Sequence, residues 1–234
     1  MEKPLLDKQD QYKFPMGQLI YEQMPDAEVT FRLHNRRRDM RLADYVRPEQ
    51  LQEYYDDLRQ ANFTADEIAI LEKQADKNYS QAYLGYLAAV RLPEIQVGIG
   101  PESNDLTAET TAPWNQSSLW EIPMLSALPE LYYPRYIEAH GGSMQQVWDE
   151  GDRRLSAMIE AFRQHPDLRF AEFGTRRRFS SDWQDHAVER LASELPEQLI
   201  GTSNPWLADK YNIPAVGTNA HELGMVYAAR HEAE

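Results

Sequence analysis

Glu172-Phe173-Gly174-Thr175-Arg176-Arg177-Arg178 is the most informative segment of this chain, because it combines a strand end, a glycine and three arginines. The short apolar run at 170–173 is typical of a buried strand, Gly174 interrupts it, and Ser180-Ser181-Asp182 is typical of a helix start. Three arginines at the carboxyl end of a strand, facing a helix N-terminus, favour a ligand that carries carboxylate or phosphate. For this triplet taken alone, the alternative is a solvated basic turn that makes surface ion pairs.

Two further strand-loop-helix transitions follow downstream. Residues 198–201 and 213–217 are predicted as strands, and each leads through a polar turn into a helix. In the first turn, Gly201-Thr202-Ser203-Asn204, we expect Asn204 to cap the helix that begins at Pro205. The second turn is Thr218-Asn219-Ala220-His221-Glu222. Three successive strand-helix units place their polar turns on one rim, as in a β/α barrel, so the sequence predicts a site there.

The composition excludes several classes of function. The chain has 234 residues, enough for one large domain or two small ones, and its formal charge is 24 − 38 = −14. Such a charge disfavours binding to nucleic acid or to an anionic membrane. There is no cysteine, which excludes disulfides, thiolate nucleophiles and zinc-thiolate sites. No stretch has the length to span a bilayer and no apolar leader begins the chain, so we expect a soluble cytoplasmic protein.

The predicted elements divide the chain in two. Strands are expected at 27–33, 94–99 and 106–111, and helices at 48–61, 64–75, 80–90, 118–131 and 143–164. The predicted fold class is α/β: an α+β N-terminal domain at 1–135, then the first βα units of an irregular β/α barrel at 136–234. The boundary is placed at Tyr132-Tyr133-Pro134-Arg135 and Gly141-Gly142. A complete barrel needs about eight strand-helix pairs, and only three are predicted, so the barrel is expected to be incomplete.

Several motifs, in order along the chain, resemble the nicotinate phosphoribosyltransferase family. They are Asp10, Tyr12, Lys13 and Met16 (DxYKxxM), Ala112-Pro113-Trp114 with 120–125, EFGTRRR with Phe179-Ser180 and Gln184, GTSN, and PAVGTNAHE. The resemblance runs from about Asp10 to Glu222. It implies an enzyme that joins nicotinate to 5-phosphoribosyl-1-pyrophosphate (PRPP), with ATP and Mg²⁺, to form nicotinate mononucleotide and pyrophosphate. This is the first step of NAD biosynthesis from nicotinate.

The resemblance also implies partners. Members of the family are dimers in which each active site borrows residues from the other subunit, and they are considerably longer than this chain. We therefore expect the N-terminal portion of such an enzyme, which pairs with a second copy or with a complementing C-terminal half. The carboxylates that hold the metal are expected beyond Glu234, so no metal ligand is named.

The resemblance assigns roles around the pyridine ring. Phe173 is similar to the aromatic residue that stacks on one face, and Tyr12, from the neighbouring subunit, to the residue on the other face. The alternative is a core phenylalanine and a tyrosine that makes helix contacts. Arg176 matches the residue that binds the carboxylate of nicotinate. For Arg177 and Arg178 the alternative is an internal ion pair with Glu172 or Asp182.

Ser203 and Thr202 are further substrate-binding candidates. The related nicotinamide enzymes carry an aspartate at the position of Ser203, and an aspartate would repel the ionised nicotinate. A neutral hydroxyl favours nicotinate, while a role for Thr202 in a turn, or in a water-mediated contact with ribose, remains open.

His221 matches the histidine that the family phosphorylates with ATP, and Glu222 is the expected orienting residue for its ring. Alone, a histidine at a helix start is more often a local hydrogen-bonding residue. Arg36 and Arg38 follow a predicted strand in a region that reaches phosphates in the family. Two other functions stay open: a nicotinamide-preferring phosphoribosyltransferase, or a non-catalytic dimerisation or regulatory half-subunit that associates with another chain and forms no product alone.

Overall fold

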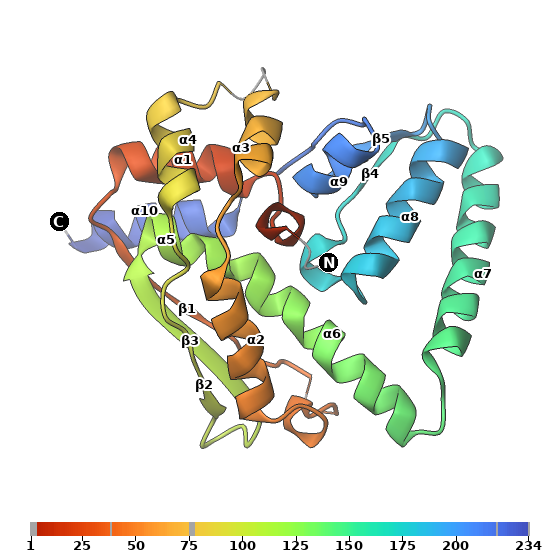
Figure 1. The fold of residues 1–234 in the computed structure, drawn as a ribbon, viewed down its shortest axis with the longest axis horizontal. Coiled ribbons are helices and arrows are strands. Elements are labelled where there is room, and N and C mark those ends of the chain that lie inside the picture. Colours follow the sequence, from red (N-terminus) through yellow and green to blue (C-terminus); the bar gives the residue numbers. More distant parts are fainter. Residues whose placement is uncertain (1–3, 38, 75–77, 219, 234) are drawn as a thin grey trace.

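The structure is a computed structural model that describes residues 4–37, 39–74, 78–218 and 220–233. Arg38 and Asn219 lie outside the described residues. None of the described helices combines the length and the apolar character needed to cross a membrane. Helices and strands are mixed, as the predicted α/β class requires, and they form two parts that lie side by side in Figure 1. These parts are here called the first and the second layer.

The first layer is built on a three-stranded antiparallel sheet of order β1-β3-β2. The strands β1 (Glu28–Arg32), β2 (Gln96–Ile99) and β3 (Leu106–Pro113) agree with the predicted strands. Thr30 lies opposite Thr111, and Val97 opposite Ala108. Alternate residues of β3 are buried, which is the pattern of a strand with one face on a core.

Helices pack against this sheet and enclose the larger core with it (Figure 1). Three of them were predicted: α2 (Pro48–Gln60), α3 (Ala65–Glu72) and α4 (Gln81–Ala89). The Thr64 hydroxyl accepts from the Glu67 amide and completes the predicted capping box of α3. The remaining elements of this layer are η1 (Leu5–Lys8), α1 (Lys13–Gln23), η2 (Leu42–Asp44), α5 (Trp114–Ser117) and η3 (Ser118–Trp120).

Helix α6 (Glu121–Ala139) connects the two layers and is longer than predicted. We expected a helix that ends at Leu131, before Tyr132-Tyr133-Pro134-Arg135, and this end is wrong: Pro129 and Pro134 both lie inside the helix. Aromatic packing outweighs the proline signal. Tyr132 is buried and stacks on Tyr136 at 5.5 Å between ring centroids, and Tyr45 packs edge-on against both.

The second layer contains two of the three predicted strands. Strands β4 (Phe170–Glu172) and β5 (Leu199–Thr202) are parallel, with Glu172 opposite Thr202. The long helix α7 (Met144–Arg163) precedes them, capped by Ser143 as predicted, and α8 (Ser181–Glu194) lies between them in the chain. A smaller core of Leu155, Ile159, Leu191, Leu195 and Leu199 holds this layer together.

The strand predicted at 213–217 is reduced to a single parallel bridge between Thr202 and Ala215. Pro214 has no N–H to donate, so the ladder cannot extend through it. Its carbonyl approaches the strand so closely that a Cβ on Gly201 would lie 2.2 Å from the Pro214 oxygen. Gly201 also has a φ of +149°, so this position requires glycine.

The chain then returns to the first layer. After α9 (Pro205–Lys210), helix α10 (His221–Ala233) lies beside α1 and α5 (Figure 1). Residues Leu5 to Gln11, which include η1, are buried between the layers. The Gln11 amide donates to the Ser203 carbonyl at 2.6 Å, which ties this N-terminal segment to the turn after β5.

Candidate functional site

The three arginines of the 172–178 segment do not share one environment. They lie in and just after η4 (Thr175–Arg177), a short 3-10 turn closed by a bond from the Arg177 amide to the Gly174 carbonyl. The side chain of Arg176 is 39% exposed, and its Nη1 donates to Glu121 Oε1 at 2.9 Å. The side chain of Arg178 is 1% exposed, so only part of the triplet can meet a ligand.

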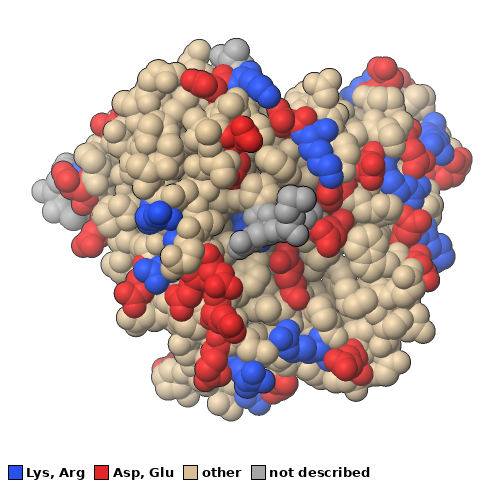
Figure 2. Space-filling view, in the orientation of Figure 1, with Lys and Arg blue, Asp and Glu red and all other residues tan. Residues whose placement is uncertain are grey.

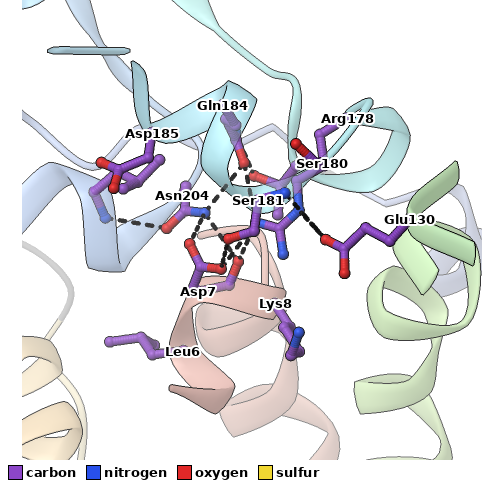
Figure 3. Close-up of polar contacts among 12 residues, drawn as sticks. Leu6, Asp7, Lys8, Glu130, Arg178, Ser180, Ser181, Gln184, Asp185 and Asn204 are labelled. Atoms are coloured by element: carbon purple, nitrogen blue, oxygen red, sulfur yellow. Dashed lines mark hydrogen bonds and ion pairs between the residues drawn. The ribbon is translucent and has the colours of Figure 1, made fainter. Parts of the chain in front are cut away.

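Arg178 is bound inside the protein, as the alternative reading of the triplet expected, but its partners are Asp7 and Glu130. Nη1 lies 3.0 Å from Asp7 Oδ2, and Nε lies 3.5 Å from Glu130 Oε1. Ser181 and Asn204 also donate to Asp7, so several side chains converge on one buried carboxylate (Figure 3). This cluster anchors η1 to η4 and to the start of α8.

A second buried carboxylate shapes the turn that carries Arg176. Glu172 accepts from Thr202 Oγ1 at 2.5 Å, from Gln184 Nε2 at 3.1 Å and from the Gly174 amide. Burial raises the pKa of Glu172, although these hydrogen bonds oppose the shift. Gln184 Nε2 also donates to Thr175 Oγ1 at 3.0 Å. The direction of the turn is therefore set by hydrogen bonds from α8 and β5.

Lys13 lies at the centre of a third cluster. Its side chain is 0% exposed, and Nζ lies 2.5 Å from Glu121 Oε2 and 2.8 Å from Glu222 Oε2. The Tyr12 hydroxyl donates to Glu121 Oε2 at 3.1 Å. Burial raises the pKa of Glu121, but Lys13 and the hydrogen bonds from Lys13, Arg176 and Tyr12 outweigh it and lower the pKa to about 2. Glu121 is thus an ionised carboxylate between two cations.

Arg176, Arg177 and the predicted Arg36 line one groove of about 640 Å³, here called the basic groove. It lies between the segment after β1 and helix α6. Its other charged and titratable lining residues are Arg32, His34, Arg37 and Glu121, and its apolar lining includes Met124, Leu125, Leu128 and Tyr132. On the face of the molecule in Figure 2, lysine and arginine side chains of the described residues are interspersed with aspartate and glutamate. Of the residues that the structure describes, five arginines and one glutamate line the basic groove, which gives it a local excess of positive charge even though Arg32 pairs with Glu109 and Arg37 with Asp39.

The other predicted residues lie around this centre. Tyr12 is joined to Arg176 through Glu121 within a single chain. A Cβ on Gly217 would lie 3.0 Å from the Tyr12 nitrogen, so the loop before His221 packs directly against Tyr12. Phe173 is 48% exposed at the end of β4, which does not fit the alternative of a core residue.

Thr202 and Ser203 are both fully buried. The Thr202 hydroxyl donates to Glu172, and the Ser203 hydroxyl donates to Asp10 Oδ1 at 2.6 Å. Asn204 caps α9 through a bond from the Leu207 amide, as predicted. A direct contact of Thr202 or Ser203 with a substrate stays a prediction.

His221 is the exposed first residue of α10. We expected Glu222 to orient its ring, but the Glu222 carboxylate turns to other partners. Oε2 accepts from Lys13, and Oε1 accepts from Ser118 at 2.7 Å and from Trp114 at 3.3 Å. Arg38, the second phosphate candidate, lies outside the described residues.

Sequence reasoning did not predict that Asp7, Glu121 and Glu130 hold the arginines of the site in place. It named Lys13 only as part of a family motif and assigned it no contact. Lys13 carries the one charge between positions 13 and 21, which is a weak signal of a buried ion pair. The partners of Asp7 are 171 to 197 positions away, so no local pattern points to them. Among the described residues, histidine and acidic side chains do not gather in groups of three or more that could hold a metal ion.

Comparison with known proteins gives a consistent result. A model described as the nicotinate phosphoribosyltransferase (NAPRTase) N-terminal domain matches residues 7–129, and a model of the nicotinate phosphoribosyltransferase (NAPRTase) family matches residues 168–233.

Solved structures agree with these matches. The crystal structure of nicotinate phosphoribosyltransferase from Porphyromonas gingivalis is 28% identical, with a TM-score of 0.82, and the match covers 95% of this chain and 55% of that one. A Vibrio cholerae nicotinate phosphoribosyltransferase shares the fold, with 24% identity and a TM-score of 0.72, over 94% of this chain and 52% of that one. The chain thus spans little more than half the length of these relatives.

Proposed function

Because the chain belongs to the nicotinate phosphoribosyltransferase family, we propose that it contributes to the synthesis of nicotinate mononucleotide and pyrophosphate from nicotinate and PRPP, coupled to ATP hydrolysis. The ring nitrogen of nicotinate attacks C1 of the ribose, and pyrophosphate leaves with the bonding electrons. This reaction would be the first step of NAD biosynthesis from nicotinate in the cytoplasm. Since the chain spans about half the length of its relatives, we propose that it works with a second copy or a complementing C-terminal half.

The observation that supports this proposal most is that Arg36, Arg176 and Arg177 line one groove. Both substrates are anions, and PRPP carries several phosphate oxygens. Arg176 uses Nη1 for Glu121, and a guanidinium has further N–H donors for a planar carboxylate. In our proposal Arg176 binds the nicotinate carboxylate, while Arg36 and Arg38 bind phosphate.

Carboxylates neutralise part of this positive charge, because Arg32 pairs with Glu109 and Arg37 pairs with Asp39. Lys13 shares its charge between Glu121 and Glu222, and Arg176 keeps for a ligand the guanidinium donors that Glu121 does not use. Burial raises the pKa of Asp10 and of Glu172, and hydrogen bonds from Ser203 to Asp10 and from Thr202 to Glu172 oppose the shift.

We propose that the pyridine ring stacks on the exposed Phe173, with Tyr12 from a neighbouring subunit on its other face. Ser203 and Thr202 would then act indirectly, because their hydroxyl groups donate to Asp10 and to Glu172 and hold these side chains in place.

We assign the energy coupling to His221. Its imidazole is exposed at the start of α10, where a neutral ring nitrogen can attack the γ-phosphorus of ATP and release ADP. Mg²⁺ bound to the phosphates of ATP or PRPP would neutralise their charge during transfer. The described residues offer no cluster that would hold this ion. No step is therefore assigned to a metal bound by this chain alone.

Calorimetric titration of the chain with nicotinate tests whether Arg176 binds the nicotinate carboxylate. Arg176→Lys keeps the charge but loses the paired donors, so we expect a nicotinate dissociation constant at least tenfold higher. Arg153→Lys, in an exposed ion pair on α7, is the matched control and should bind as the unchanged chain does. Equal binding by both variants, or no binding by the unchanged chain, would refute the assignment.

A product assay tests the enzyme as a whole. The chain is incubated with nicotinate, PRPP, Mg²⁺ and ATP, and nicotinate mononucleotide is measured by chromatography. Product that depends on ATP and is lost in His221→Ala supports the assigned role. No product from the folded chain, with or without a complementing C-terminal half, would favour a non-catalytic dimerisation or regulatory subunit.

One observation favours the nicotinamide-preferring alternative. Asp10 is buried beside Ser203, and it lies close enough to Arg176 for their charges to interact. A carboxylate at this place could accept from the amide of nicotinamide. A competition experiment that compares the affinities of the chain for nicotinate and for nicotinamide distinguishes the two substrates. Tighter binding of nicotinamide would overturn our substrate assignment.

A further inference from the structure

The buried ammonium of Lys13 lies between carboxylates that belong to two different parts of the proposed site. Its three N–H donors meet Glu121 Oε2 at 2.5 Å, Glu222 Oε2 at 2.8 Å and Ser118 Oγ at 3.3 Å. Because all three donors have acceptors and the side chain is 0% exposed, the ammonium holds both carboxylates in place.

Each of these carboxylates leads to a residue with an assigned role. Glu121 accepts from Arg176 Nη1 at 2.9 Å and from the Tyr12 hydroxyl at 3.1 Å. Glu222 follows His221 directly in α10. A continuous chain of ion pairs, here called the Lys13 bridge, thus joins α10 to η4 in the order Glu222, Lys13, Glu121 and Arg176.

The first turn of α10 is held by the Lys13 bridge and by apolar packing of Leu223 against the cluster that contains Met16 and Trp114. In the described part of the chain, the side-chain polar contacts of this turn run through Glu222, which also accepts from Ser118 and Trp114. The outer face of the helix is open to solvent, and Met225 is 70% exposed. Loss of the Glu222 ion pair would therefore loosen the turn that carries His221, while its apolar contacts keep α10 in place.

The other end of the bridge controls Arg176. With Lys13 removed, Glu121 would have Arg176 as its remaining cation and would draw more of the guanidinium donors to itself. Fewer donors would then face the basic groove. The position of Arg176 thus depends on a lysine that is not among its own contacts.

We propose that Lys13 is a positioning residue that joins the His221 turn to Arg176, so that nicotinate affinity and the order of α10 depend on each other. The inference rests on the proposed function for the identity of the ligand at Arg176. Coupling between two sites is reciprocal in binding free energy. A change at His221 that moves Glu222 would therefore alter nicotinate affinity, and nicotinate would alter the order of α10 by the same coupling.

The decisive variant is Glu222→Gln, because in the described residues Glu222 forms no hydrogen bond or ion pair with Arg176 and is linked to it by the Lys13 bridge. We expect the nicotinate dissociation constant to rise at least threefold. We also expect amide hydrogen exchange to speed up both in the first turn of α10 and at 174–177, where the Arg177 amide is bonded in η4. Lys13→Met should enlarge both effects, and Lys13→Arg should restore part of the affinity.

Tyr227→Phe is the matched control. It removes another polar contact of α10, from the Tyr227 hydroxyl to Gln23 Oε1 at 3.1 Å, but leaves the Lys13 bridge intact. This variant should keep the nicotinate affinity and the exchange rate at 174–177 of the unchanged chain.

If Glu222→Gln and Tyr227→Phe behave alike at 174–177 and in nicotinate affinity, the inference is wrong. If the unchanged chain binds no nicotinate, the proposed function fails, and the exchange rates at 174–177 still decide whether the bridge joins the two segments. A Lys13→Met chain that does not fold leaves the comparison of Glu222→Gln with Tyr227→Phe decisive.

Discussion

Replacement of Asp7 by alanine should be among the most damaging single changes to stability. The Asp7 side chain is 0% exposed and lies 3.0 Å from Arg178 Nη1. Ser181 Oγ donates to it at 2.6 Å, and Asn204 Nδ2 donates at 3.2 Å. The change removes the acceptor of these donors and leaves a buried guanidinium short of a counter-charge.

The magnitude follows from what remains around Arg178. Breaking a buried ion pair from one side costs about 3–5 kcal/mol, because the remaining charge stays buried. Glu130 still lies 3.5 Å from Nε, and Gln184 Oε1 accepts from Nη1 at 3.2 Å, so the guanidinium keeps part of its compensation. We therefore expect a loss near the lower limit, about 3 kcal/mol in the free energy of unfolding. This is a large fraction of the roughly 5–15 kcal/mol that stabilises a typical domain.

Urea denaturation followed by circular dichroism measures this loss, with Glu150→Ala as the matched control. Glu150 also pairs with arginines, Arg153 and Arg154, but all three side chains are well exposed. An exposed pair of this kind contributes about 0–1 kcal/mol. If the two variants lose the same stability, or if Asp7→Ala loses less than about 1 kcal/mol, burial is not the source of the stability of the Asp7–Arg178 pair and the reasoning is refuted.

Three further outcomes are expected. Gly201→Ala should lower the melting temperature, because the backbone is strained at this φ and the new Cβ would clash with Pro214. Gly224→Ala, at a position in helix α10 where a Cβ meets no other atom, should raise the free energy of unfolding by about 0.5–1 kcal/mol. Equal shifts of the two variants in a thermal scan would contradict this expectation. The pKa of Glu121 is lowered to about 2 in the folded state, so its ionised form contributes up to about 3 kcal/mol to the free energy of unfolding. This contribution is present above pH 4.5 and is lost as the pH falls toward 2. Glu121→Gln should therefore lose less stability across that pH range than the unchanged chain, and equal losses would contradict the assignment. Phe173→Ser should change the free energy of unfolding by less than about 0.5 kcal/mol, because Phe173 is half exposed. The same change should weaken nicotinate binding roughly tenfold in a titration, because the stacking face is lost. An unaltered affinity would show that Phe173 is not part of the site.

Local signals predicted the elements well because their causes are local. The N-caps Thr64, Ser143 and Asn204 each accept the expected backbone amide within three residues, and the helices start where these residues predict. The turns after β4 and β5 lie where the sequence predicted them for the same reason. Where the cause was not local, the sequence misled us: the helix predicted to end at Leu131 continues because Tyr132 and Tyr136 stack on each other.

The support of the candidate site could not be predicted, because it depends on pairs far apart in the chain. Polar residues such as Asp7 and Asp10 are typical of an exposed N-terminal segment, and in the structure they are buried. Lys13 pairs with Glu222 across 209 positions. The family motifs marked several of these positions, but a motif does not state which residue meets the ligand and which residue supports it.

The triplet Arg176-Arg177-Arg178 shows how backbone geometry separates residues of identical chemistry. A 3-10 turn has three residues per turn, so successive side chains project roughly 120° apart. One arginine then faces the basic groove and Glu121, and another enters the protein interior, where Asp7 meets it. Charge alone therefore does not identify the binding residue. The same substitution should act on ligand affinity at Arg176 and on the free energy of unfolding at Arg178, because the first guanidinium is open to solvent and the second is buried.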